Sequence, residues 1–201
     1  MIITFYGVRG STAVPGPMTV KYGGNTSCVH IELESGNDLI LDAGTGIRQL
    51  GNKLLGKSTP ANILLSHGHW DHIQGYPFFA PIYQPERDIH VYISAEKGHK
   101  LLSTLLQQMD GTHFPVRVED LPSNNFPKFK GIESELYERE GIKVVRQALN
   151  HPGGESAYKI DENGASLAYV TDNELDPPYA ASTNYDQWVN YLHGVDVLIH
   201  D

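Results

Sequence analysis

Six consecutive positions near the middle of the chain, His67-Gly68-His69-Trp70-Asp71-His72, contain three histidines and one aspartate. The five residues before Ser66, residues 61–65, are mostly apolar and predict a buried strand. Packing alone does not explain this cluster, because burying an imidazole is costly unless a partner accepts its lone pair. Neutral imidazole and carboxylate are ligands that zinc and related divalent ions prefer. The cluster therefore predicts a metal site where a strand ends, in preference to a solvated loop.

Composition and charge restrict the partners of this chain. Its 201 residues, 40% hydrophobic and 19% charged, suffice for a substantial core and favour one domain, residues 1–201. The net charge is −9, with only 15 Lys and Arg. This balance disfavours extended binding to nucleic acid or to an anionic membrane, since both are gripped mainly by clustered cations. A small charged substrate remains compatible with it.

Cys28 is the only cysteine, so no disulfide can form within the chain. A reducing compartment, the cytoplasm, is therefore expected. No base neighbours Cys28 in the sequence, which favours a small buried hydrophobic residue over a nucleophile. The N-terminal residues show no signal-peptide pattern, and no run approaches the roughly 18 apolar residues of a membrane helix.

The pattern of apolar residues predicts a sheet-rich α/β fold with helices inserted between strands. Strands are expected at residues 2–8, 29–33, 39–41, 61–65, 89–93, 142–149, 157–160, 166–170 and 195–199, the last of them buried. Helices are expected at residues 46–55, capped by Thr45, and at 98–109 and 187–192. Hairpins such as 29–33 with 39–41 favour layered sheets over a doubly wound parallel sheet.

Three further polar residues follow predicted strands. His151 comes after residues 142–149, Asp172 after 166–170, and Asp201 after 195–199. Each alone is ordinary, as a loop histidine or a turn-forming aspartate. Polar groups that repeatedly follow strands are nevertheless expected to converge at one edge of a sheet, where binding sites are common.

The motif series resembles that of the metallo-β-lactamase fold hydrolases, with residues 67–72 followed by His151 and then Asp172. The flanking segments are similar to the branch near ribonuclease Z and the cyclic-phosphate phosphodiesterases; they are residues 7–11, 22–28, 41–46 and 71–75. The resemblance runs from Ile3 to Asp201. It implies an α/β fold, an αββα sandwich of two mixed sheets flanked by helices, whose second half is incomplete in this chain.

The resemblance also implies two divalent metal ions, zinc or manganese. The first ion would be held by His67, His69 and His151. The second would be held by Asp71 and His72, and Asp172 would bridge both. These ions would act on a water that attacks a small phosphodiester, cyclic ones included.

Two aspartates receive further roles from the same resemblance. Asp71 would also orient the attacking water, as the catalytic residue. Asp42 would contact the metal ligands, and not the metal itself, and would hold them in position. The chain would thus be a metal-dependent hydrolase, a phosphodiesterase by preference.

This sequence differs from the family pattern at its C-terminal end. In the family, a further histidine that completes the second ion's ligands lies beyond the strand that ends here at Asp201, as does a Gly-His-Ser segment. The second metal site is therefore expected to be incomplete. His200 and Asp201 are alternative ligands, although ordinary hydrogen bonding at the strand end is the favoured interpretation.

The sequence leaves the substrate open, because fold and ligands do not determine it. The alternatives are a hydrolase of a thioester, a lactone or a β-lactam, a nuclease of RNA ends, and a catalytically weak metal-binding protein. Self-association into a homo-oligomer is open as well.

Several aromatic residues lie in or shortly after the histidine cluster. Phe78, Phe79 and Tyr83 are expected in the core rather than in a base-stacking platform. Trp70 fits a packing role and a role in lining the site equally. Residues 112–127, rich in Pro, Phe and Asn, predict an extended loop or a lid.

Overall fold

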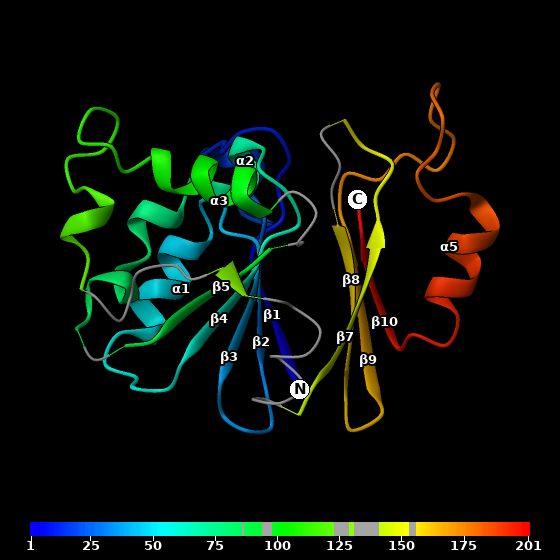
Figure 1. The fold of residues 1–201 in the computed structure, drawn as a ribbon, viewed down its shortest axis with the longest axis horizontal. Helices are drawn as coiled ribbons and strands as arrows, with labels where there is room; N and C mark the ends of the chain where they lie inside the picture. Colours follow the sequence, from blue (N-terminus) through cyan, green and yellow to red (C-terminus); the bar gives the residue numbers. More distant parts are fainter. Residues whose placement is uncertain (86, 94–97, 123–128, 131–140, 153–155) are drawn as a thin grey trace. The chain divides into compact units, whose positions relative to one another are not determined.

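A computed structural model describes residues 1–85, 87–93, 98–122, 129–130, 141–152 and 156–201. The chain forms two compact units, residues 1–130 (unit 1) and residues 131–201 (unit 2), each containing one mixed sheet (Figure 1). The predicted α/β class with two mixed sheets is confirmed. The prediction that residues 1–201 act as a single domain stays a prediction.

Unit 1 contains a six-stranded sheet with the strand order β1-β2-β3-β4-β5-β6. Its strands are β1 (Ile2–Gly7), β2 (Cys28–Glu32), β3 (Asp38–Leu41), β4 (Ala61–Leu64), β5 (Ile89–Tyr92) and β6 (Phe129–Lys130). The first three strands pair antiparallel, which confirms the hairpin of residues 29–33 with 39–41. β3 to β6 pair parallel, because the helical segments between them return the chain to the same end of the sheet.

The α-helices of unit 1 are α1 (Ile47–Leu54), α2 (Trp70–Ile73) and α3 (Gly98–Gln107). The 3₁₀ helices are η1 (Pro17–Thr19), η2 (Tyr76–Phe78), η3 (Ala80–Tyr83) and η4 (Val118–Asp120). Apolar residues of α1 and α3 share one core with alternate residues of β4 and β5, so both helices lie on the same face of the sheet (Figure 1). Cys28 is buried as expected.

Two predictions about unit 1 are wrong in detail. Thr45 does not cap α1, which begins after Gly46; the Thr45 hydroxyl instead accepts a hydrogen bond of 2.9 Å from the backbone N–H of Thr26. Phe79 is buried as predicted, but Phe78 is 54% exposed and Tyr83 is only partly covered. Both differences arise in turns, where tertiary contacts rather than apolar spacing decide which side chain is covered.

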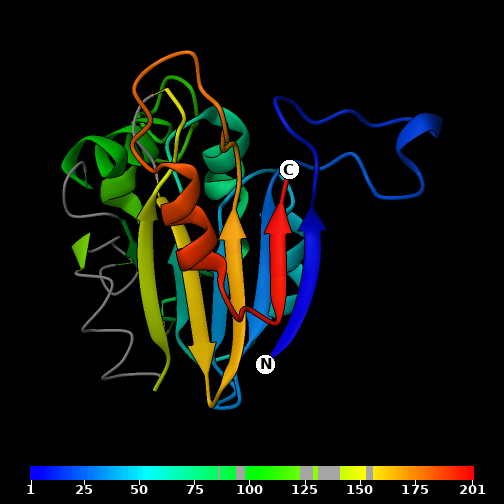
Figure 2. The same ribbon diagram turned by 90° about the vertical axis from the view of Figure 1, so that its right-hand side faces the viewer.

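Unit 2 contains a four-stranded sheet with the order β10-β9-β8-β7. The strands are β7 (Lys143–Ala148), β8 (Ser156–Glu162), β9 (Ala165–Val170) and β10 (Val197–His200). β7, β8 and β9 pair antiparallel, and β10 pairs parallel to β9. The helix α5 (Tyr185–Leu192) crosses one face of this sheet (Figure 2), where Trp188 packs among buried residues of the strands.

The last strand of unit 2 is not buried, contrary to prediction. Val197 and Leu198 of β10 are 40% and 47% exposed. β10 is an edge strand whose described neighbour is β9, so little covers its side chains. Of the predicted segment 112–127, residues 123–127 lie outside the described residues, so the choice between loop and lid stays open.

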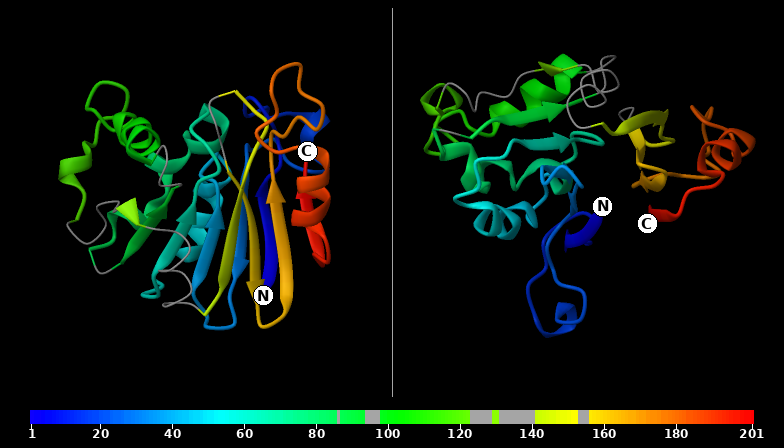
Figure 3. Two further views of the ribbon diagram at one scale, coloured as in Figure 1. Left: turned by 45° about the vertical axis from the view of Figure 1, so that its right-hand side comes forward. Right: turned by 90° about the horizontal axis from the view of Figure 1, so that it is seen from below.

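A long loop between β1 and β2 projects from the sheet of unit 1, as the dark blue segment of Figures 2 and 3 shows. Its tip carries exposed Met18 and Val20, and its two sides are joined by a hydrogen bond from Val14 N to Gly24 O. Ser11, at its base, reaches the histidine cluster. In the described parts of both units, every helix is too short or too polar to cross a membrane.

Candidate metal centre

The ends of two parallel strands bring Asp42 and the histidine cluster together in unit 1. β3 and β4 pair in register as far as Leu41 and Leu64, and Asp42 N donates a hydrogen bond of 2.9 Å to Leu64 O. The carboxyl ends of parallel strands lie at one edge of a sheet, so the residues that follow them become neighbours. Asp42 Oδ1 accordingly accepts a hydrogen bond of 2.7 Å from Ser66 N.

Asp42 organises the histidines from a fully buried position. Its Oδ2 atom accepts a 2.8 Å hydrogen bond from the Ser66 hydroxyl and lies 2.7 Å from His72 Nδ1. Burial by itself would raise the pKa of Asp42, but the charge and hydrogen bond of His72 lower that pKa below its ordinary value. A carboxylate on Nδ1 orients an imidazole and assigns metal binding to Nε2. This is the contact expected of a group that supports a ligand.

Asp42 also has an unusual backbone conformation, with φ at 61°. A non-glycine residue in the left-handed region is strained, and such strain persists only where surrounding contacts maintain it. Both carboxylate oxygens of Asp42 are engaged, and these contacts hold the residue in place.

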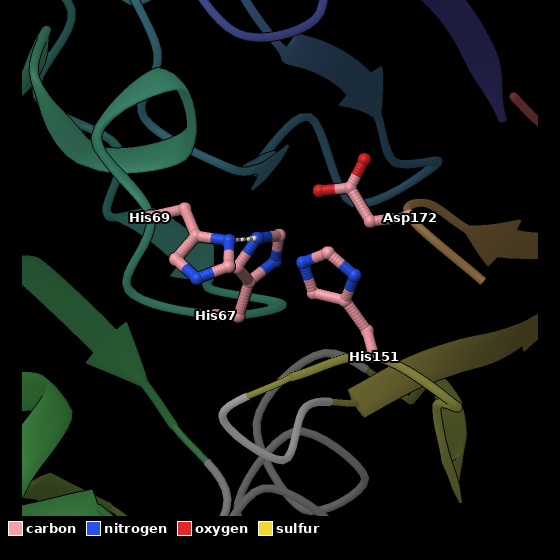
Figure 4. Close-up of side chains that lie close together, drawn as sticks. All are labelled: His67, His69, His151 and Asp172. Atoms are coloured by element: carbon pink, nitrogen blue, oxygen red, sulfur yellow. Dashed lines mark hydrogen bonds between the residues drawn. The ribbon is translucent and has the colours of Figure 1, made fainter. Parts of the chain in front are cut away.

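The side chains of His67 and His69 face each other. Figure 4 shows their contact, in which His67 Nε2 lies 3.1 Å from His69 Nδ1. The second ring nitrogen of His67 lies 3.0 Å from the Ser66 hydroxyl oxygen. Two nitrogens bound to one tetrahedral zinc at the usual bond length are roughly 3.3 Å apart. The geometry of this pair therefore fits two ligands of one ion.

Asp71 and His72 form a second pair of potential ligands. His72 Nε2 lies 3.6 Å from Asp71 Oδ2, and the same Asp71 oxygen accepts a 2.7 Å hydrogen bond from Ser11 N. The ring centroids of His67 and His72 are 4.0 Å apart, so the two pairs are neighbours. An oxygen and a nitrogen at this separation are compatible with a second divalent ion.

Two glycines allow α2 to lie against the loop that follows β3. A Cβ atom on Gly44 would lie 2.2 Å from Asp71 O, and one on Gly75 would lie 2.0 Å from Gly44 O. Ala43 N donates to His72 O at 2.7 Å, and Gly75 N donates to Ala43 O at 2.9 Å. These backbone contacts set the positions of Asp71 and His72 relative to Asp42.

In unit 2, a buried asparagine joins the turns that carry His151 and Asp172. The Asn150 amide nitrogen donates to Glu174 O at 3.0 Å and to Thr183 O at 2.8 Å, and its backbone N–H donates to the side chain of Asn173 at 3.0 Å. The ligand atoms of His151 and Asp172 lie within 4.8 Å of each other. The two residues predicted from separate strand ends are thus neighbours within their unit.

Asp201 also follows its strand in unit 2. Its Oδ1 atom accepts a hydrogen bond of 2.7 Å from Asp172 N, and Asp172 has φ at 55°. Asp201 therefore makes the strand-end hydrogen bond that the sequence favoured for it.

The described residues with the chemistry to bind a metal fall into both units. Unit 1 provides His67, His69, Asp71 and His72, and unit 2 provides His151 and Asp172. Figure 4 draws four of these side chains, His67, His69, His151 and Asp172. That both sets share ions stays a prediction. Sequence reasoning missed the roles of Ser66 and Asn150, although each directly precedes a predicted ligand.

Family membership follows from the sequence beyond this cluster. The sequence model of the beta-lactamase superfamily domain matches residues 37–201. The chain belongs to this superfamily. The match extends from β3 to β10 and therefore includes all six predicted metal ligands. No curated protein sequence matches the chain.

Solved structures show which fold this member of the beta-lactamase superfamily has. The chain is similar to the metallo-beta-lactamase fold protein YhfI from Bacillus subtilis (TM-score 0.66, 16% identity, 98% of this chain and 68% of that chain). It is also similar to the short form of human tRNase Z (TM-score 0.60, 20% identity, 98% and 76%). A third similar structure is Zn²⁺-bound PqqB from Methylobacterium extorquens (TM-score 0.62, 14% identity, 99% and 70%). These similarities confirm the predicted metallo-β-lactamase fold.

Proposed function

We propose that this chain is a metal-dependent hydrolase that cleaves a small phosphodiester, cyclic ones included. The observation that supports metal dependence most directly is the pair of ring nitrogens on His67 and His69, 3.1 Å apart. Membership of the beta-lactamase superfamily supports hydrolysis. The preference for a phosphodiester comes from the flanking motifs, and the likeness to a fold used by a tRNase agrees with it.

The proposed ligands divide between two divalent ions, zinc or manganese. His67, His69 and His151 would hold one ion, Asp71 and His72 the other, and Asp172 would bridge them. That PqqB carries Zn²⁺ on the same fold agrees with zinc. Bound ions of this kind lower the pKa of water and offset the negative charge that develops on phosphoryl oxygens.

The residues of the chain would prepare this chemistry by orientation. Asp42 directs His72 through a contact of 2.7 Å, and Ser66 links Asp42 to His67. Asp71 is held by the N–H of Ser11, which leaves its other oxygen to orient a water toward the phosphorus. Asp71 is therefore proposed as the catalytic residue.

The test combines metal analysis with hydrolysis assays. The purified protein, supplied with zinc or manganese, is expected to release p-nitrophenol from bis(p-nitrophenyl) phosphate and to lose this activity after chelation. Two metal equivalents per chain would support catalysis by a pair of ions. One equivalent would support an incomplete second site, and none would contradict the central proposal.

Assays with other substrates distinguish the proposed phosphodiesterase from the alternative functions. Faster cleavage of a thioester, a lactone or a β-lactam than of the phosphodiester would replace the proposed substrate class. A nuclease would bind RNA with an affinity that falls steeply with salt. Stoichiometric metal binding without turnover of any of these substrates would indicate a catalytically weak metal-binding protein.

Location and assembly remain proposals as well. The single cysteine, buried and without a disulfide, favours the cytoplasm. A homo-oligomer is testable by measuring the mass of the protein in solution.

A further inference from the structure

A pocket of about 430 Å³ lies in unit 1 beside the histidine cluster. It is lined by residues of α2, the η2 segment, α3 and the loop after α3. Trp70, on its wall, stands between His69 and Asp71 in the chain. A pocket of this volume is in the range that accepts a small ligand.

Three aromatic side chains, Trp70, Phe78 and Phe114, contribute to the apolar part of the pocket. Trp70 is 75% exposed and Phe78 is 54% exposed, although such rings gain free energy when they are covered. The ring of Phe114 packs edge-to-face on Phe78, with centroids 5.2 Å apart and an interplanar angle of 81°. The pocket therefore offers aromatic surfaces on which a planar group can stack.

Three glutamine side chains, Gln74, Gln107 and Gln108, form much of its polar part. The Gln108 amide nitrogen donates to Ile73 O at 3.2 Å and to Leu105 O at 3.1 Å, so its carbonyl oxygen is the atom available to accept a further hydrogen bond. Amides pair well with the mixed donors and acceptors on the edge of a heteroaromatic ring.

The charge of the lining residues indicates which part of a substrate the pocket could bind. The described residues that line it include no Lys, Arg, Asp or Glu, and its titratable member is His113, which lies 2.9 Å from Asp110. Among these described lining residues, a phosphate or a carboxylate would find no Lys or Arg. An uncharged ring with polar edges would find both stacking surfaces and hydrogen-bond partners.

We infer that this pocket binds an uncharged heteroaromatic ring of the substrate, with the size and hydrogen-bonding character of a nucleobase. The inference rests on the proposed function, because it places the phosphodiester at the neighbouring histidine cluster. Trp70 is covalently bonded to both His69 and Asp71, and consecutive Cα atoms lie about 3.8 Å apart. One wall of the pocket therefore belongs to the same short segment as two residues proposed to hold the metal.

Binding can be measured without catalysis, through the fluorescence of Trp70. The protein has two tryptophans, and the Trp188→Phe variant retains only Trp70. Adenosine, added to the chelator-treated variant, is expected to quench this fluorescence saturably and to bind more tightly than ribose or benzyl alcohol. The Phe114→Ala substitution in the same background is expected to weaken adenosine binding at least about fivefold, because stacking on one aromatic ring contributes at least that much.

The control removes an exposed phenylalanine outside the pocket. Phe5 is 51% exposed on β1, and Phe5→Ala is expected to leave adenosine binding unchanged. Absence of saturable quenching, or equal binding in the Phe114→Ala variant, would overturn the inference. Equal affinity for benzyl alcohol would overturn its heteroaromatic part. Because Trp188 is buried, titration calorimetry of adenosine into the unsubstituted protein replaces fluorescence if that variant fails to fold.

Kinetics distinguish this inference from the proposed function. Thymidine 5′-p-nitrophenyl phosphate and methyl p-nitrophenyl phosphate share a leaving group and differ only in the second ester. The nucleotide is expected to have the lower KM, and Phe114→Ala is expected to raise only that KM. Cleavage of both with equal KM would overturn the pocket and leave the function standing. Cleavage of neither would refute the function, while the adenosine titration would still decide on the pocket.

Discussion

Two buried aspartates at opposite ends of β3 have different tasks. Asp38 begins the strand and contacts three basic side chains, with His30 Nε2 at 2.9 Å, Lys57 Nζ at 3.2 Å and an Arg87 nitrogen at 2.9 Å. Asp42 follows the strand and contacts the histidine cluster. The first aspartate contributes to stability, and the second prepares the proposed metal site.

Replacing Asp42 with asparagine should weaken metal binding while leaving the fold intact. The amide keeps the shape of the carboxylate but loses the charge that favours His72 with Nδ1 protonated. Loss of such a supporting group typically costs about 10–100-fold in metal affinity. Competition for zinc with a chromophoric chelator measures this, and Asp186→Asn on the exposed face of α5 is the control. Unchanged affinity would show that Asp42 does not support a ligand.

Replacing Asp38 with asparagine should destabilise unit 1 in a pH-dependent way. Burial would raise the pKa of Asp38, but hydrogen bonds and charges from His30 and Lys57 lower that pKa below its ordinary value. The variant leaves the buried Arg87 without its anion, which should cost about 3–5 kcal/mol of unfolding free energy. Urea denaturation at a series of pH values measures the difference.

The lowered pKa of Asp38 determines the pH range of this effect. The unfolded carboxyl titrates near pH 3.9, so the stabilisation should be complete above about pH 5 and should decline as pH falls toward the folded pKa. Lys57→Ala is the control, because Lys57 is partly exposed and its removal should cost less than about 1 kcal/mol. A difference between Asp38→Asn and the unsubstituted protein that does not shrink in acid would contradict the assignment.

At the scale of elements, the position of α2 is determined by backbone contacts and not by an apolar sequence pattern. The helix has only four residues, Trp70–Ile73, so apolar periodicity could not predict it. Its position depends on the close approach of Gly44 and Gly75 to neighbouring backbone. The strand β10 is the opposite case, since its apolar residues predicted burial but its edge position leaves them exposed.

The Gly75→Ala substitution should displace α2 and the ligands it carries. The added Cβ would lie 2.0 Å from the carbonyl oxygen of Gly44, and backbone cannot yield as a side-chain tip can. We expect a loss of about 1–3 kcal/mol or more in unfolding free energy and weaker zinc binding. Gly10→Ala, with no atom within 4 Å of its Cβ, should change stability by less than about 0.5 kcal/mol. Equal stability of the two variants would contradict this account of α2.

At the scale of the whole molecule, the proposed metal site would require both units. Unit 1 would contribute the contiguous cluster, and unit 2 would contribute His151 and Asp172, from turns joined by Asn150. Ligands of one ion act together, so their substitutions should not be additive.

A double-mutant cycle on His67 and His151 tests this sharing. Each single alanine substitution should lower zinc affinity at least about tenfold, and the double variant should bind little more weakly than either single variant. Equilibrium competition with a chelator measures all four proteins. His193→Ala, an exposed histidine of unit 2, should have no effect. Fully additive losses would show that His67 and His151 bind different ions.

The sequence by itself determined most of the strands, the two-sheet α/β class and the residue types of the candidate site. Alternating and continuous apolar runs report which segments are covered, and four metal-binding groups in six positions are what a compact ligand shell requires. The sequence could not determine which turns lie together. The resemblance implied that Asp42 supports a ligand, but only the tertiary structure identified that ligand as His72. Only the tertiary structure likewise placed Asn150 between two distant turns and Arg87 on Asp38. These contacts depend on strand order and on close backbone approach, which are properties of the folded chain and not of its local pattern.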